Sequence, residues 1–133
     1  MKTLVNRYDK KLINQLPKVL FQGRIIVIQS KDEAARAVEF LLKQNILGID
    51  TETKPVFKKG AGMNPVALLQ VATYDTCFLF RLNHIGFTDD LIRLMSDEAV
   101  LKVGLSLKDD FMQLCRRKQF EAGKHAELQT MVR

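Results

Sequence analysis

The hydrophobic positions of this chain fall into short β-branched runs that alternate with segments of helical spacing. Residues 24–29 contain four consecutive β-branched side chains, whereas the apolar residues of 31–43 recur every three or four positions. The pattern predicts strands over 24–29, 46–52, 66–73, 77–82, 100–104 and 125–129. It predicts helices over 31–43, 89–95 and 107–118.

The connections between these elements indicate a mixed sheet. Only residues 74–76 separate two of the strands, so we expect a β-hairpin that pairs 66–73 with 77–82 antiparallel. The strand at 100–104 follows a helix, and a helical crossover returns the chain to a parallel position. The order of elements therefore predicts an α/β domain, a mixed sheet flanked by helices.

Composition and charge add one feature to this picture. The length of 133 residues suits one domain, and no apolar run is long enough to span a membrane. Two cysteines make no disulfide framework, and reduced thiols favour a cytoplasmic location. Six of the 21 basic residues lie in 1–24, against one acid. We therefore divide the chain into a basic N-terminal arm, 1–23, and a domain, 24–133. Such an arm suits a polyanion, and a solvated N-terminus explains it equally well.

The triplet Asp50-Thr51-Glu52 closes an apolar stretch and is the first candidate for chemistry. Residues two apart on a strand point to the same side, so both carboxylates should project together from the end of a buried strand. Burying two like charges is costly unless a cation lies between them. The triplet thus suggests a site for a hard divalent ion, Mg²⁺ or Mn²⁺, although a chain with 15 acids contains such a pair readily by chance.

A second acidic pair, Asp109-Asp110, begins the helix that follows strand 100–104. Helices after parallel strands start at the strand's carboxyl end, where α/β proteins place their sites. Acids also favour the first turn of a helix because of its dipole, so the pair has an explanation without function. Considered with the triplet at 50–52, it points to a carboxylate cluster at one edge of the sheet.

Four segments occur in an informative order and spacing: 47–52, 66–71, 77–80 and 102–111. As a set they resemble the 3′–5′ exonuclease domains of the ribonuclease D type, members of the DEDD superfamily. The resemblance implies a ribonuclease H-like fold. It also implies hydrolysis of phosphodiester bonds at single-stranded 3′ ends of RNA or DNA with two Mg²⁺ or Mn²⁺ ions.

The same resemblance assigns residues to the site. Asp50 and Glu52 match the first family motif, and Asp110 matches the acid of the second motif. The buried face expected for Phe111 favours Asp110 over Asp109 as the ligand. These three carboxylates are the predicted catalytic and metal-binding residues.

The family's third motif, Tyr-x-x-x-Asp or His-x-x-x-x-Asp on a later helix, has no match at the required place; His84 and Asp89 have the spacing but precede the second motif. We therefore expect an N-terminal portion of a longer exonuclease, with the C-terminal helices missing. Uncovered apolar sheet would then favour self-association. An alternative is a non-catalytic nucleic-acid-binding module that keeps the fold, and a further one is an α/β domain whose acids only decorate element ends.

The segment 53–65, with two prolines, two glycines and three lysines, is predicted to be a loop beside the acidic triplet. Lys54, Lys58 and Lys59 are candidates for contacts with a nucleic-acid backbone, and Phe57 for stacking on a terminal base. An ordinary solvated loop anchored by Phe57 explains the same residues.

Overall fold

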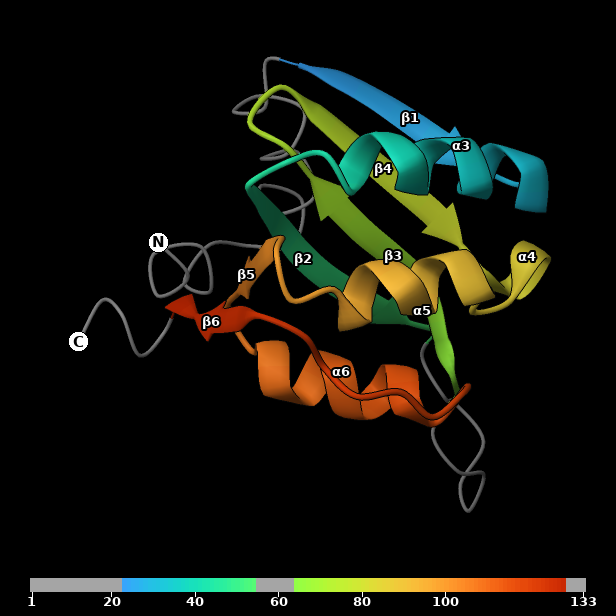
Figure 1. Ribbon diagram of the computed structural model, residues 1–133. Helices are drawn as coiled ribbons and strands as arrows, with labels where there is room; N and C mark the ends of the chain where they lie inside the picture. Colours follow the sequence, from blue (N-terminus) through green and yellow to red (C-terminus); the bar gives the residue numbers. More distant parts are fainter. Residues whose placement is uncertain (1–22, 55–63, 129–133) are drawn as a thin grey trace, which may run out of the picture.

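The computed structural model describes residues 23–54 and 64–128, which form a sheet with helices packed against it (Figure 1). The strands are β1 (Arg24–Ile28), β2 (Ile46–Thr53), β3 (Val66–Ala72), β4 (Thr76–Arg81), β5 (Leu101–Gly104) and β6 (His125–Glu127). The helices are α3 (Lys31–Leu41), α4 (Leu82–Ile85), α5 (Asp89–Ser96) and α6 (Leu107–Cys115).

The strands form one mixed sheet in the order β1-β4-β3-β2-β5-β6. β2, β3 and β4 are antiparallel neighbours, whereas β1 pairs parallel with β4, β5 with β2, and β6 with β5. The predicted hairpin and the predicted parallel strand after the crossover are therefore both confirmed. β6 lies at one edge of the sheet.

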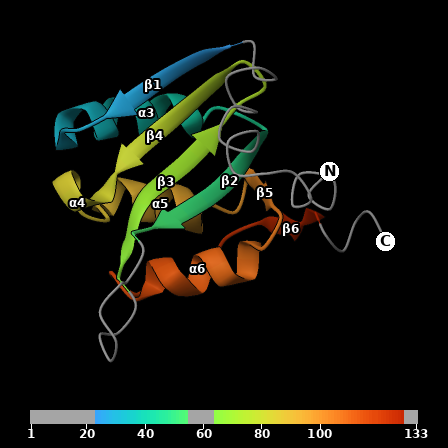
Figure 2. The same ribbon diagram turned by 180° about the vertical axis from the view of Figure 1, so that it is seen from behind.

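Helices α3 and α5 cover one face of the sheet, in front of it in Figure 1 and behind it in Figure 2. Their buried side chains meet the inward residues of β1, β3 and β4 in one core, which includes Val38, Leu94, Leu69 and Phe80. α6 lies beside the other half of the sheet, in contact with β2 and β6.

The first helix begins where the sequence predicts a capping box. The Ser30 hydroxyl accepts a hydrogen bond from the Glu33 backbone N–H at 3.2 Å, and the Glu33 carboxylate accepts one from the Ser30 N–H at 3.1 Å. Such a box satisfies two donors that the first helical turn leaves without intrahelical partners.

The structure differs from the sequence prediction in one element. α4 is a single turn in place of a loop, because Leu82 and Ile85 are both buried on one side of it. The turn stops at Gly86, whose φ of 76° is readily adopted only without a Cβ. That glycine is the sequence signal that could have identified the turn.

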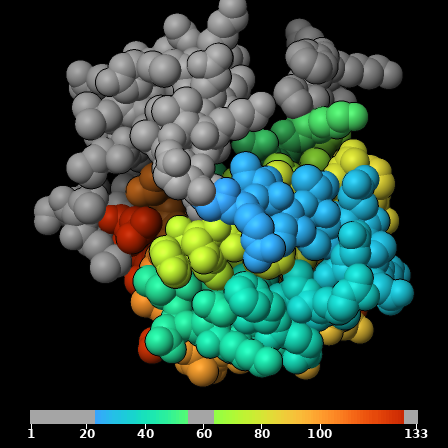
Figure 3. Space-filling model, turned by 90° about the horizontal axis from the view of Figure 1, so that it is seen from above, coloured from blue at the N-terminus to red at the C-terminus, as the bar shows by residue number. Residues whose placement is uncertain are grey.

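The edge strand β1 presents apolar side chains outward: Ile25 is 47% exposed and Val27 43%. Figure 3 shows β1 in blue beside α3 in cyan at this end of the molecule. The predicted self-association through sheet surface stays a prediction. No helix in the described ranges is long and apolar enough to cross a membrane. The predicted N-terminal arm lies outside the described residues except for Gly23.

Candidate metal centre

Strand β2 carries the acidic triplet, and its alternation decides where the two carboxylates point. Leu47 and Ile49 face the core, so Asp50 and Glu52 take positions that are exposed. The expectation of two carboxylates crowded together at low dielectric is therefore wrong, because water reaches both. Asp50 Oδ1 accepts a hydrogen bond from the Thr51 backbone N–H at 2.9 Å, a contact within its own strand.

Asp110 is the buried acid of this region, with only 9% of its surface exposed. It lies in the first turn of α6, and its Oδ1 accepts a hydrogen bond from the Thr51 hydroxyl at 2.7 Å. That bond joins α6 to the middle residue of the triplet. Asp109 is exposed, so the geometry supports Asp110 as the acid that belongs with β2.

The Asp110 carboxylate lies in surroundings that disfavour its negative charge. Burial raises the pKa of Asp110 from 3.8 to about 6. The hydrogen bond from Thr51 acts in the opposite direction, and the negative charges of Asp50, Glu127 and Asp109 contribute smaller parts of the same rise in pKa. A cation beside this group would offset the burial cost and the repulsion together.

Glu127, which ends β6, is the neighbour that the sequence did not single out. Its Oε1 accepts hydrogen bonds from the backbone N–H groups of Leu107 and Lys108, at 2.7 and 3.3 Å. Its Oε2 is buried and has no hydrogen-bond partner among the described residues. The only signal in the sequence was an acid in the predicted strand 125–129.

The donor chemistry of this region fits a hard divalent ion, because all of its candidate ligands are carboxylate oxygens. Within residues 23–54 and 64–128, no three His, Cys, Asp or Glu side chains are grouped closely enough to hold a metal. Asp50 and Glu52 are exposed, so their side chains can change rotamer without disturbing the core. The uncompensated charge on Asp110 and the orphaned oxygen of Glu127 are both consistent with a cation there.

The candidate nucleic-acid contacts are only partly visible. Lys54 follows directly after β2 and is exposed, and its carbonyl oxygen accepts a hydrogen bond from the Asn64 side chain at 2.9 Å. Phe57, Lys58 and Lys59 lie outside the described residues, so their predicted roles stay predictions. Lys54 thus lies next to the strand that carries the acidic triplet.

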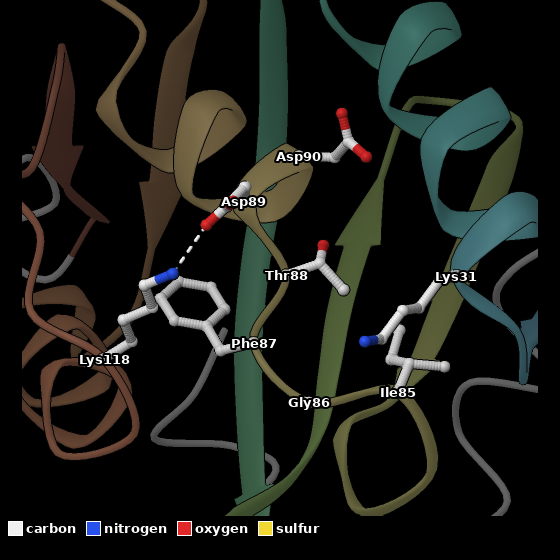
Figure 4. A pocket seen from close by; sticks show the side chains of 8 residues that line it. All are labelled: Lys31, Ile85, Gly86, Phe87, Thr88, Asp89, Asp90 and Lys118. Atoms are coloured by element: carbon white, nitrogen blue, oxygen red, sulfur yellow. Dashed lines mark hydrogen bonds and ion pairs between the residues drawn. The ribbon is translucent and has the colours of Figure 1, made fainter.

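A pocket of about 440 Å³ lies elsewhere, between the start of α3, the turn before α5 and the segment after α6 (Figure 4). Lys31 and Lys118 line it from different elements, and Lys118 Nζ donates to Asp89 Oδ1 at 2.6 Å. This bond and the charge of Lys118 lower the pKa of Asp89. Asp89 is thus paired with a lysine, consistent with His84 and Asp89 having their spacing by coincidence.

Comparisons with known sequences point to one family. A family model described as 3′-5′ exonuclease matches residues 25–132. A Drosophila melanogaster protein, "Exonuclease 3'-5' domain-containing protein 2", is 39% identical over 101 residues, which covers 70% of this chain and 17% of the relative. An Arabidopsis thaliana "3'-5' exonuclease" is 27% identical over 109 residues, covering 74% and 38%. The chain spans well under half the length of either relative.

Solved structures give the same fold. The Aedes aegypti Nibbler EXO domain has a TM-score of 0.69 at 20% identity, over 81% of this chain and 54% of that chain. The EXD2 exonuclease domain soaked in Mg and GMP has a TM-score of 0.69 at 22% identity, over 83% and 59%. Trypanosoma brucei RNase D in complex with RNA U12 has a TM-score of 0.72 at 17% identity, over 86% and 41%. The fold is therefore the mixed-sheet α/β fold of ribonuclease H-like exonuclease domains.

Proposed function

Because the chain belongs to the 3′–5′ exonuclease family, we propose that it supplies Asp50, Glu52 and Asp110 to a divalent-metal site that hydrolyses phosphodiester bonds at nucleic-acid 3′ ends. The observation that carries the proposal is the bond from Thr51 to Asp110, 2.7 Å long. It brings the acid from α6 to the very triplet that matches the first family motif. Asp110 therefore lies beside β2, the strand that carries the two exposed acids.

Each residue has a distinct part in this site. Asp110 provides a fixed carboxylate, since burial and the Thr51 hydroxyl hold it in place. Asp50 and Glu52 provide carboxylates that solvent and substrate can reach. Divalent ions such as Mg²⁺ or Mn²⁺, two in the mechanism proposed for the family, would lower the pKa of the attacking water and stabilise the leaving 3′ oxygen.

The substrate we propose is a single-stranded 3′ end, of RNA or DNA. One solved structure is a complex of T. brucei RNase D with RNA U12, and another is the EXD2 domain soaked in Mg and GMP, which supports nucleic acid as the partner. In this chain Lys54 lies at the end of β2 and would contact the phosphate backbone, with Phe57, Lys58 and Lys59 as further candidates. Contacts of this kind weaken as salt increases.

Metal binding tests the site directly and requires no turnover. Mn²⁺ is titrated into the chain and into Asp50→Asn, Asp110→Asn and Asp109→Asn. We expect the first two substitutions to weaken Mn²⁺ binding at least tenfold, because each removes a charged oxygen ligand. Asp109→Asn is the matched control: it changes an exposed acid in the same helical turn and should bind like the wild type. Equal affinity in all four proteins would contradict the ligand assignment.

A nuclease assay distinguishes an exonuclease from a non-catalytic nucleic-acid-binding module. Release of mononucleotides from single-stranded RNA and DNA is measured with Mn²⁺, with Mg²⁺ and with EDTA, on wild type and Asp50→Asn. The expected result is metal-dependent release that Asp50→Asn abolishes. The separation of the carboxylates among the described residues favours one other function, a non-catalytic nucleic-acid-binding module. Oligonucleotide binding without release, unchanged in Asp50→Asn, would support that module.

A further inference from the structure

Glu127 occupies an unusual position, because it caps a helix that begins in a different part of the chain. β6 pairs parallel with β5, and Glu127 stands opposite Gly104, shortly before α6 starts. Ser106 holds the N-cap position of α6 but makes no capping hydrogen bond with its side chain. Glu127 Oε1 instead receives the N–H groups of Leu107 and Lys108. The first turn of α6 is therefore held from β6.

This turn contains Asp110, so whatever fixes the turn also fixes the buried acid. The backbone N–H of Asp110 bonds to the Ser106 carbonyl at 3.0 Å, which closes the turn that Glu127 caps. On its other side, Asp110 receives the hydroxyl of Thr51 in β2. Two contacts from different strands thus set the place of Asp110: Thr51 from β2, directly, and Glu127 from β6, through the helix start.

The second oxygen of Glu127 needs a separate explanation. Oε2 is buried and, among the described residues, accepts no hydrogen bond. A buried oxygen without a donor is costly, and such atoms usually mark an ordered water or an ion. Glu127 also lies close enough to Asp110 for its charge to act on that carboxyl. Water bound to a cation beside Asp110 is a donor that Oε2 would accept.

We propose that Glu127 is a positioning residue of the metal site: Oε1 anchors the α6 turn that carries Asp110, and Oε2 accepts a hydrogen bond from metal-bound water. The inference rests on the proposed function, since it needs a cation near Asp110. It assigns no direct metal contact to Glu127. Partners that orient ligands in this way commonly change metal affinity by about 10- to 100-fold when they are removed.

The test uses two substitutions that separate the two oxygens. In Glu127→Gln the amide oxygen can still accept the N–H groups of Leu107 and Lys108, while an NH₂ group replaces Oε2. In Glu127→Ala both contacts are lost. Mn²⁺ affinity is measured by calorimetric titration, and the midpoint of urea unfolding is measured in EDTA.

Two control variants make the readout specific. Glu121→Gln removes the charge of an exposed glutamate in the same C-terminal segment. Glu33→Ala removes the capping box of α3, a helix cap outside the metal site. We expect Glu121→Gln to match the wild type in both measurements. Glu33→Ala should lower the unfolding midpoint and leave Mn²⁺ affinity unchanged.

For Glu127→Gln we expect Mn²⁺ affinity about tenfold weaker with an unfolding midpoint close to that of the wild type. Glu127→Ala should bind Mn²⁺ at least as weakly and unfold at lower urea. Wild-type Mn²⁺ affinity in Glu127→Gln would overturn the proposal, because a simple helix cap is rescued by glutamine. Equal weakening by Glu33→Ala would overturn it as well. Absence of Mn²⁺ binding by the wild-type chain would instead refute the metal site of the proposed function, and the role of Glu127 with it.

Discussion

Replacing Asp110 by asparagine keeps the shape of the side chain and removes its charge, so it isolates the cost of burying that carboxylate. The pKa of Asp110 rises from 3.8 to about 6 on folding, chiefly because of burial. At about 1.4 kcal/mol for each pKa unit, this corresponds to about 3 kcal/mol. Only 9% of the residue is exposed, so solvent screening reduces the figure modestly. We expect Asp110→Asn to raise the free energy of unfolding by about 2–3 kcal/mol at pH 7.5 without metal.

The pH dependence follows from the direction of the change. A carboxyl group whose pKa is higher in the folded state stabilises the fold below its unfolded pKa, near 3.8, and loses that contribution as pH rises through about 6. Wild type and Asp110→Asn should therefore be equally stable near pH 3.5 and diverge between pH 4 and 6. The asparagine oxygen can still accept the Thr51 hydroxyl, so that contact does not enter the difference.

Urea unfolding in EDTA across pH 3.5 to 7.5, followed by circular dichroism, measures the effect. Asp109→Asn, the exposed neighbour, provides the control and should differ from wild type by less than about 0.5 kcal/mol at every pH. A less stable Asp110→Asn at pH 7.5, or a difference that does not depend on pH, would refute the reasoning. Added Mn²⁺ should stabilise wild type and leave Asp110→Asn unchanged.

Two further substitutions test the contacts around β2. Thr51→Val should lower the free energy of unfolding by about 1.5 kcal/mol at pH 7.5, because it removes the 2.7 Å hydrogen bond to the Asp110 carboxylate. Urea unfolding at pH 7.5 measures this change. An unchanged unfolding midpoint would contradict the bond. Gly104→Ala should lower the free energy of unfolding by about 2 kcal/mol, because a Cβ there would lie 2.8 Å from the Ile49 carbonyl oxygen. Gly48→Ala is the control: its Cβ would lie 3.9 Å from the nearest atom, so its stability should match that of the wild type. Thermal unfolding of both variants measures the difference.

Much of the sheet could be predicted from the sequence because its signals are local. The β-branched run of β1, the capping box of α3 and the short link between β3 and β4 each specify a nearby structure. The element bounds differ from prediction by at most three residues, and the largest difference is at a helix end: α6 stops at Cys115, where the prediction continued to residue 118. The family resemblance added the fold and the expected neighbours of the acidic triplet by analogy, which periodicity alone does not supply.

The parts of the site that could not be predicted depend on contacts between distant segments. Asp110 was favoured over Asp109 by the expected burial of Phe111, and Phe111 is indeed buried at 7% exposure. The hydrogen bond from Thr51 to Asp110 spans 59 positions in sequence, and the one from the Leu107 N–H to Glu127 spans 20. Nothing in the local pattern of β2 or β6 specifies either bond. The exposure of Asp50 and Glu52 was missed because alternation predicts that they share a side but not whether that side is covered.

The short pairing between β2 and β5 affects the local stability of the proposed metal site. β2 pairs with β3 over six residues, but with β5 over only the three pairs from Ile46–Leu101 to Gly48–Val103. Local unfolding separates weakly joined sections first, so we expect the β2–β5 pairing to open before the β2–β3 pairing, against the hydrogen bond from Arg117, after α6, to the Val66 carbonyl in β3. Such an opening carries Asp110 away from Asp50. A metal ion bound by both acids would link β2 to α6. Dissociation of the ion and separation of β5 from β2 would then occur together, at the same rate.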